Sequence, residues 1–258
     1  MTIYPASALR AVALRTQSLH AANGHESTPT PETICRTVEQ IGCVQIDTLH
    51  VVRRSQYLVL WSRLGTYDPA DFDALQSGPG RRLFEGWQHA ACIIPLTEYR
   101  YQIPHQRNVR GQSEQPSTWY SRWLTEHGHP ETIQMVRERI QRDGALKVSD
   151  FERGDHPPGA WWNWRPAKVA LEYLYAFGEL MIAGRDKFQR IYDLTERVLP
   201  SWVDTRAPTA EERDRFWVER GAKALGVCLP RHAGDYTWMK VTKSRPIIEA
   251  LVKEGILL

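Results

Sequence analysis

Cysteine is scarce in this sequence, with four residues in a chain of 258. Cys35, Cys43, Cys92 and Cys228 form no CxxC pair, and each lies among apolar neighbours. This usage excludes a small disulfide-stapled scaffold and shows none of the ligand spacings of zinc fingers or zinc ribbons. We therefore predict reduced thiols in the core of a cytoplasmic protein.

Long apolar segments and several common site motifs are also missing. No apolar run approaches the roughly 20 residues that span a membrane, and residues 1–5 lack the basic and then apolar pattern of a signal peptide. No HExxH motif, P-loop or GxGxxG fingerprint occurs in the right context. The segment Trp87-Gln88-His89 offers a single potential ligand. We therefore expect no metal and no cofactor.

The remaining composition is that of an ordinary globular protein. Hydrophobic residues make up 42% of the chain and charged residues 24%, enough to bury a core in two or three small modules. The formal net charge of +3 permits a polyanionic partner without requiring one.

Residues 44–49 are the most informative short segment. They alternate apolar and polar side chains, and three of them are β-branched, which predicts a short half-buried strand. On a strand, Gln45 and Asp47 would project from the same face, where an amide beside a carboxylate can position and activate a water molecule. The ordinary interpretation of such a pair is the solvated face of an edge strand.

The first half of the chain predicts helices followed by two short strands, the order of a winged-helix module. The expected helices cover residues 7–21, 31–41, 55–64 and 69–75, and the expected strands cover residues 82–85 and 91–94. Thr30 and Pro31 supply a cap and a first-turn proline to the second helix, and Gly42 ends it.

The middle of the chain predicts a second winged-helix module. Its expected helices cover residues 131–142, 148–151 and 165–177, and its expected strands cover residues 180–183 and 188–192. Residues 184–187 would form the tight turn between the two strands.

The end of the chain echoes the middle. Arg245-Pro246 and the glycine at position 255 repeat the pattern of Arg165-Pro166 and Gly178, after two further expected helices at residues 210–225 and 231–238. We predict an incomplete third module that stops inside its first wing strand. The fold class is then mainly α with small β-hairpin wings (α+β), as tandem winged helix-turn-helix modules at residues 1–125, 126–200 and 201–258.

Several blocks in a fixed order resemble one known family. They are Gln45-Ile46-Asp47 with residues 52–65, Trp87-Gln88-His89, and residues 161–168, 171–174 and 188–194. Together they resemble the winged-helix DNA glycosylases of the AlkZ/YcaQ type, which unhook interstrand crosslinks, and the Gln-x-Asp motif is similar to that of the YcaQ branch. The resemblance runs from about residue 7 to the last residue.

The resemblance implies hydrolysis of the N-glycosidic bond of N7-alkylated purines in double-stranded DNA, including crosslinked ones. It implies that Gln45 and Asp47 are catalytic, with Asp47 as general base and stabiliser of the oxocarbenium-like sugar. Two departures from the family stand out: Ala90 replaces the usual Glu after the His of the Trp-x-His block, and the family's C-terminal β-rich domain is absent. An inactive, truncated relative that still binds DNA is therefore the alternative.

Basic residues supply a second layer of candidates for DNA binding. Phosphate contact is the functional interpretation, and solvated surface charge or a structural histidine is the ordinary one. The candidates are Arg53, Arg54, His50, His89, Arg185, Lys187 and Arg190. Residues 161–164, Trp-Trp-Asn-Trp, could stack on bases or pack on the helix that follows.

No lysine or N-terminal proline is placed for Schiff-base chemistry, so we expect a monofunctional hydrolase that acts as a monomer on the bacterial nucleoid, without membrane contact. A winged-helix transcription regulator and a protein-interaction scaffold remain the competing interpretations, because winged helices serve unrelated roles.

Overall fold

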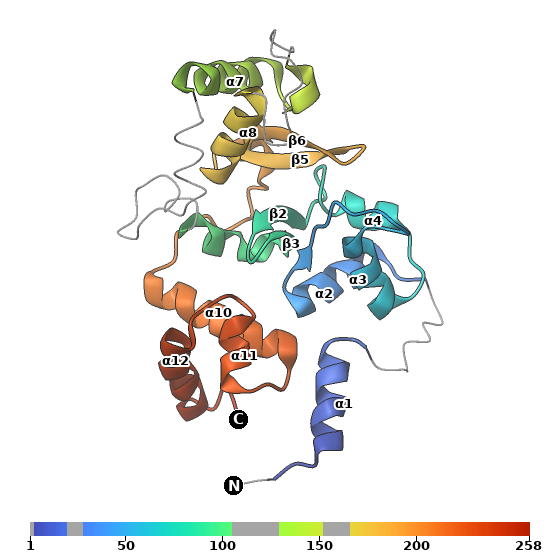
Figure 1. The fold of residues 1–258 in the computed structure, drawn as a ribbon, viewed down its shortest axis with the longest axis vertical. Coiled ribbons are helices and arrows are strands. Elements are labelled where there is room, and N and C mark those ends of the chain that lie inside the picture. Colours follow the sequence, from blue (N-terminus) through green and yellow to red (C-terminus); the bar gives the residue numbers. More distant parts are fainter. Residues whose placement is uncertain (1–2, 20–27, 105–128, 152–165) are drawn as a thin grey trace. The chain divides into compact units, whose positions relative to one another are not determined.

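The computed structural model describes residues 3–19, 28–104, 129–151 and 166–258. Contacts divide the chain into two compact units, each rich in helices and built around one small antiparallel sheet of three strands (Figure 1). The first unit combines residues 1–75, 82–98 and 208–258, and the second combines residues 76–81 and 99–207. The predicted mainly α fold class with small β-hairpin wings is confirmed. No helix within the described ranges has the length and apolar content to cross a membrane.

The first unit contains eight helices and three strands among the described residues. They are α1 (Ala6–Thr16), α2 (Pro31–Ile41), β1 (Val44–Gln45), α3 (Ser55–Leu64), α4 (Pro69–Ala74), β2 (Leu83–Trp87), β3 (Ala91–Pro95), the start of the 3-10 helix η1 (Leu96–Gln102), α10 (Ala210–Leu225), α11 (Pro230–Asp235) and α12 (Val241–Lys253). The expected ends of α2, α3 and α10 are confirmed, whereas α1 ends at Thr16 and α11 at Asp235, earlier than residues 21 and 238 where they were expected to end. Thr30 accepts a hydrogen bond from the Thr33 N–H at 3.3 Å at the start of α2, and Gly42 ends that helix with φ = 85°.

The core of this unit lies where α2, α3 and α4 cover the sheet. Ile34 and Val38 of α2, Leu60 of α3 and Phe72 of α4 are fully buried against Ile93 of β3. The sheet has the order β1-β3-β2, so the last strand of the hairpin runs between the other two. A continuous apolar core therefore supports β1 from behind.

The expected strand over residues 44–49 is wrong beyond Gln45. Only Val44 and Gln45 pair with β3, opposite Ile93 and Cys92, and the Ile46 N–H adds one hydrogen bond to the Ala91 carbonyl at 2.8 Å. Asp47 then leaves the sheet, because its carboxylate accepts a hydrogen bond from the Leu49 N–H and folds the chain into a turn. The alternation of apolar and polar residues predicted the strand, but it could not predict the hydrogen bond between the Asp47 side chain and the Leu49 backbone that ends it.

The second unit repeats the topology of the first. It contains α7 (Pro130–Asp143), β4 (Leu146–Lys147), the 3-10 helix η2 (Val148–Asp150), α8 (Pro166–Ala176), β5 (Leu180–Asp186), β6 (Gln189–Leu194) and α9 (Thr195–Val198). Its sheet has the order β4-β6-β5, which is the arrangement of β1-β3-β2. Each unit thus holds a helix, a short strand, further helical turns and a hairpin, as expected of winged-helix modules.

The wing of the second unit differs in its turn. The prediction placed the turn at residues 184–187, but the strands continue to Asp186 and the turn is formed by Lys187 and Phe188, with φ of 45° and 74°. Gly184 lies instead at a register shift in β5. The buried Arg81 guanidinium donates to the Ile182 and Ala183 carbonyls beside this shift, at 3.1 and 2.6 Å.

The last segment departs from the internal echo. Helix α12 begins at Val241, so Pro246 lies inside the helix instead of opening it. Residues 255–258 form no strand: Gly255 has φ = 73°, and the Ile256 and Leu257 N–H groups cap α12 at the Leu251 carbonyl. Helices α10, α11 and α12 pack together within the first unit, while the predicted boundaries near residues 125 and 200 remain predictions (Figure 1).

A buried ion pair joins α10 to the rest of the first unit. The Arg220 Nε atom lies 3.0 Å from Glu98 Oε1, and its terminal nitrogens donate to the Glu39 and Gln40 carbonyls at the end of α2, at 2.5 and 3.4 Å. Gly42 permits this approach, because a Cβ there would lie 2.3 Å from the guanidinium. Burial raises the pKa of Glu98 to about 7, although Arg220 opposes the rise.

We expect the Glu98→Gln substitution to flatten the pH dependence of stability. The folded-state pKa of Glu98 lies above its ordinary value of 4.5, so the folded protein binds more protons than the unfolded chain between pH 4.5 and about 7. The resulting contribution of Glu98 to the free energy of unfolding is on the order of 3 kcal/mol. It is fully present below pH 4.5 and is lost as the pH rises through 7. Urea unfolding across this range checks the slope, and a variant that keeps the parent's slope would contradict the assignment.

Candidate active-site loop

The loop between β1 and α3 carries the predicted catalytic pair. Gln45 is the last residue of β1 and has an exposed side chain, while Asp47 is half-buried at the start of the loop. Asp47 Oδ1 accepts the Leu49 N–H at 2.9 Å, and the Asp47 N–H donates to Gln56 Oε1 at 3.4 Å. Both contacts fix the backbone of Asp47, so the position of the carboxylate is set by the loop rather than by a strand face.

Gln56 is a positioning residue that the sequence did not single out. It is the second residue of α3 and its side chain is buried, with the amide oxygen turned to the Asp47 N–H. Ser55, its neighbour, donates from Oγ to the Gln45 carbonyl at 3.4 Å. The sequence does hold a clue to this role. Gln56 occupies a position on the core-facing side of an amphipathic helix, where an apolar residue is usual.

The Asp47 carboxylate is partly open to solvent. Within the described part of the chain it forms no ion pair, and it is not enclosed in the apolar core. The loop beyond it exposes three apolar side chains, since Leu49, Val51 and Val52 are 72%, 93% and 82% exposed. A carboxylate next to an exposed apolar loop suits a site that accepts a large ligand.

Basic and aromatic groups flank this loop. His50 and Arg53 are exposed, and the Arg53 guanidinium lies 5.6 Å from the centre of the Tyr57 ring. Arg54 is half-buried at the N-cap of α3. The Tyr57 hydroxyl donates to Asp73 at 2.9 Å, and burial, with this hydrogen bond second, raises its pKa to about 12. Gln45, Asp47, His50, Arg53 and Arg54 therefore all lie between the end of β1 and the N-cap of α3.

The other basic candidates belong to the wing of the second unit. Arg185 donates to the Phe188 carbonyl at 2.6 Å and lies 4.2 Å from its ring, so it supports the hairpin turn. Arg190 forms an ion pair with Glu172 at 3.1 Å, and Glu172 also accepts the Tyr192 hydroxyl. Lys187 is exposed at the tip. The two arginines thus have structural partners, while the lysine is the exposed cation of this wing.

His89 lies in the turn between β2 and β3. Its ring is half-buried, 6.3 Å from the ring of Trp238, and its imidazole lies close to two thiols, Cys43 and Cys92. All three potential ligand atoms lie within 4.8 Å of one another. The spacing along the chain does not reveal this group, because 49 positions separate the cysteines. The expected absence of a metal rested on that spacing alone.

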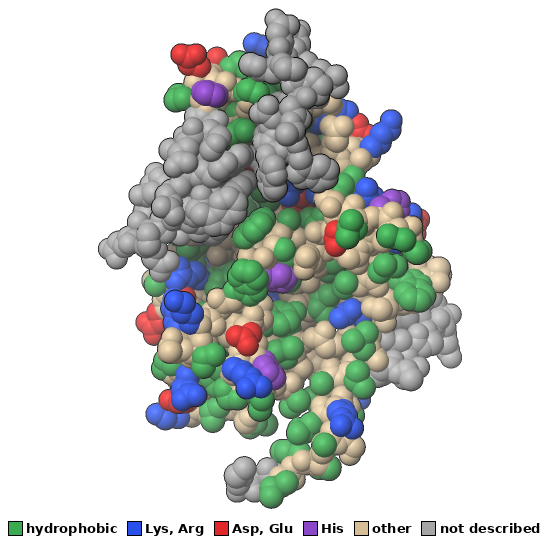
Figure 2. Space-filling model, in the orientation of Figure 1, with side chains coloured by type: hydrophobic (Ala, Val, Ile, Leu, Met, Phe, Trp, Pro, Cys, Tyr) green, Lys and Arg blue, Asp and Glu red, His purple; other side chains and the backbone are tan. Residues whose placement is uncertain are grey.

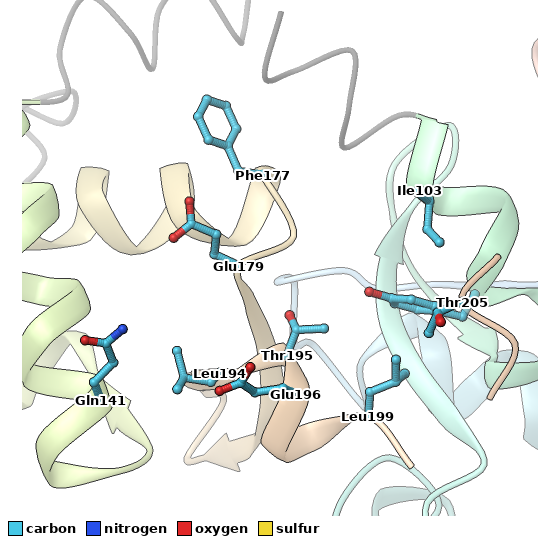
Figure 3. Close-up of a pocket in the computed structure, with 10 residues that line it drawn as sticks. Ile103, Gln141, Phe177, Glu179, Leu194, Thr195, Glu196, Leu199 and Thr205 are labelled. Carbon is cyan, nitrogen blue, oxygen red and sulfur yellow. The ribbon is translucent and has the colours of Figure 1, made fainter. Parts of the chain in front are cut away.

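A pocket of the second unit lies elsewhere in the chain. It has a volume of about 560 Å³ and is lined by Gln141, Phe177, Glu179 and Thr195, among other residues, none of them a predicted site residue (Figure 3). Glu179 there is paired with Arg137 at 2.8 Å. Residues 161–164, with their tryptophans, lie outside the described residues. Figure 2 shows hydrophobic side chains interspersed with Lys, Arg and His on the described surface of the first unit.

Comparison with known proteins identifies relatives of this arrangement. The family model described as DNA glycosylase AlkZ-like matches residues 38–258. The fold is similar to the solved structure of Streptomyces sahachiroi DNA glycosylase AlkZ, with a TM-score of 0.55 and 13% sequence identity. That similarity covers 94% of this chain, and the chain spans 64% of the length of that protein.

Proposed function

Because the chain belongs to the AlkZ-like DNA glycosylase family, we propose that it is a monofunctional DNA glycosylase that releases N7-alkylated purines from duplex DNA. Its substrates include purines joined in interstrand crosslinks. The single observation that carries the proposal is the loop that holds Asp47, whose carboxylate is fixed by the backbone and free of ion pairs among the described residues. Arg53 and Arg54 follow it in the chain.

The chemistry follows from the charge of the lesion. Alkylation at N7 makes the purine cationic, so the base departs as a neutral molecule when the bond between N9 and C1′ breaks, and both bonding electrons stay on N9. The sugar becomes an oxocarbenium-like cation that a nearby carboxylate stabilises. Asp47 then takes a proton from the water that bonds to C1′, which leaves an abasic site.

Gln45 supports this step by positioning. Its amide both donates and accepts hydrogen bonds, so it can hold the attacking water or the damaged nucleotide. It sits on β1, which pairs with β3 over the apolar core, and a rigid element of this kind holds a catalytic group with little freedom.

Contacts to DNA surround the reacting groups. Arg53, Arg54 and His50 would meet backbone phosphates beside the lesion. Lys187, in the wing of the second unit, is a separate candidate for phosphate contact. The exposed Val51 and Val52 would rest against the unstacked base step. A crosslinked base cannot leave the helix fully, so an open loop suits bulky lesions better than a closed base pocket. We propose a monomer that acts in the bacterial cytoplasm, on the nucleoid.

The test uses a duplex with one N7-methylguanine under single-turnover conditions. We expect release of the free base, with hot alkali revealing an abasic site and no strand cleavage before alkali. Binding to damaged duplexes should show little sequence preference and should weaken steeply as the salt concentration rises, since phosphate contacts release counterions. Tight binding of the damaged duplex without release of the base would contradict the proposed glycosylase activity.

That outcome would support the second candidate, a DNA-binding protein without catalysis. The specific observation that favours it is Ala90, where the resembled family has a glutamate. Ala90 is half-buried and contributes its carbonyl to the Gln88 N–H at 3.0 Å, but it supplies no carboxylate. Replacing Ala90 with Glu should then restore base release.

A further inference from the structure

We propose that Cys43, His89 and Cys92 bind a zinc ion. The proposal concerns the first unit alone and does not depend on glycosylase activity. Cys43 Sγ, Cys92 Sγ and one imidazole nitrogen of His89 all lie within 4.8 Å of one another. With Zn–S near 2.3 Å and Zn–N near 2.0 Å, tetrahedral ligands would lie roughly 3.5–3.8 Å apart. Small side-chain adjustments therefore close the site around a metal.

The sheet brings the ligands together. Gln45 of β1 pairs with Cys92 of β3, so Cys43, two residues earlier, projects from the same face diagonally next to Cys92. His89 comes from the turn of the hairpin that ends in β3, and its ring approaches from the side of Trp238. Three segments that are remote in sequence or separated by a turn thus converge on one point.

The donor set favours a borderline-soft cation. Two thiolates with one imidazole are ligands that zinc prefers, whereas calcium and magnesium require oxygen. Cys92 is buried while Cys43 and His89 are half-buried, so a water molecule can reach the fourth position.

A bound ion would have a structural consequence for the candidate active site. It would tie Cys43, the residue that precedes β1, to His89 in the β2–β3 turn and to Cys92 in β3. Cys43 lies two residues from Gln45. His89 would then be a metal ligand and would not be available to contact DNA. The ion would hold these segments in position and would not take part in the reaction, because none of its three ligands is a hydrogen-bond partner of Asp47 within the described residues.

The test measures metal in the tag-free full chain, expressed with added zinc and dialysed against metal-free buffer. We expect about one equivalent of zinc by plasma mass spectrometry. Cobalt substituted for zinc should give a thiolate-to-cobalt charge-transfer band and the intense visible bands of a tetrahedral site. Cys43→Ser and Cys92→Ser should each lose the metal and both spectral features, and His89→Ala should lose most of the metal.

Cys228→Ser is the matched control, since Cys228 is a half-buried free thiol of the same unit, and it should retain the full equivalent. Because a core cysteine variant can fail to fold, circular dichroism checks the folding of each variant. The His89→Ala variant tests the metal site independently, since His89 is only half-buried. Parent protein that holds no zinc or cobalt above the level of the Cys92→Ser variant would overturn the proposal. A Cys43–Cys92 disulfide in peptide mass maps of freshly purified protein would overturn it as well.

Discussion

Asp47→Asn protein releases N7-methylguanine from duplex DNA about 10²–10⁴-fold more slowly than the parent, the range expected when a general base is removed. Asparagine keeps the side-chain oxygen that accepts the Leu49 N–H, so the turn survives and only the negative charge is lost. Single-turnover base release, quantified by chromatography, measures the effect. Binding of the damaged duplex should change little.

The matched control is Asp235→Asn, an exposed aspartate at the end of α11 in the same unit. It carries the same loss of charge without a role in the loop, so its rate should equal that of the parent. An Asp47→Asn variant that is as fast as the control would remove Asp47 from the mechanism.

Arg220→Met lowers the free energy of unfolding by about 3–5 kcal/mol, because removal of one partner leaves the buried Glu98 carboxyl and two backbone carbonyls without their donor. Methionine keeps an unbranched apolar stem but is shorter than arginine, so the contacts to Glu98 and to the Glu39 and Gln40 carbonyls are lost. Urea unfolding followed by circular dichroism measures the loss. The effect should be far larger than that of any surface substitution on α10.

Arg215→Met provides that comparison. Arg215 lies on the same helix and pairs with Glu254 at 2.6 Å, but both side chains are partly exposed, and solvent-screened pairs of this kind contribute little to stability. If Arg220→Met costs no more than Arg215→Met, the buried ion pair does not hold α10 against α2.

The helices were predictable because their signals are local. Thr30 and Pro31 at one end and Gly42 at the other define α2, and the capping Thr209 with Glu212 similarly opens α10. The fold class also followed from element order, since helices and hairpins in sequence leave few ways to build a core.

The errors arose where a local polar contact or a distant partner decides the structure. The hydrogen bond from the Leu49 N–H to Asp47 ends β1 early, and the bulge at Gly184 shifts the wing turn to Lys187 and Phe188. Gln56 could not be ranked as a positioning residue, because its role depends on Asp47 lying against α3. The thiols of Cys43 and Cys92 meet only through the pairing of β1 with β3.

The most direct measurement follows the products of a single-turnover reaction in ¹⁸O-labelled water, with a duplex that carries one N7-methylguanine as the substrate. We expect free N7-methylguanine and an unbroken strand whose abasic C1′ carries the solvent oxygen. An intact alkylated strand after the protein has bound it, or a strand cut at the lesion before alkali, would contradict hydrolysis by the Asp47 loop.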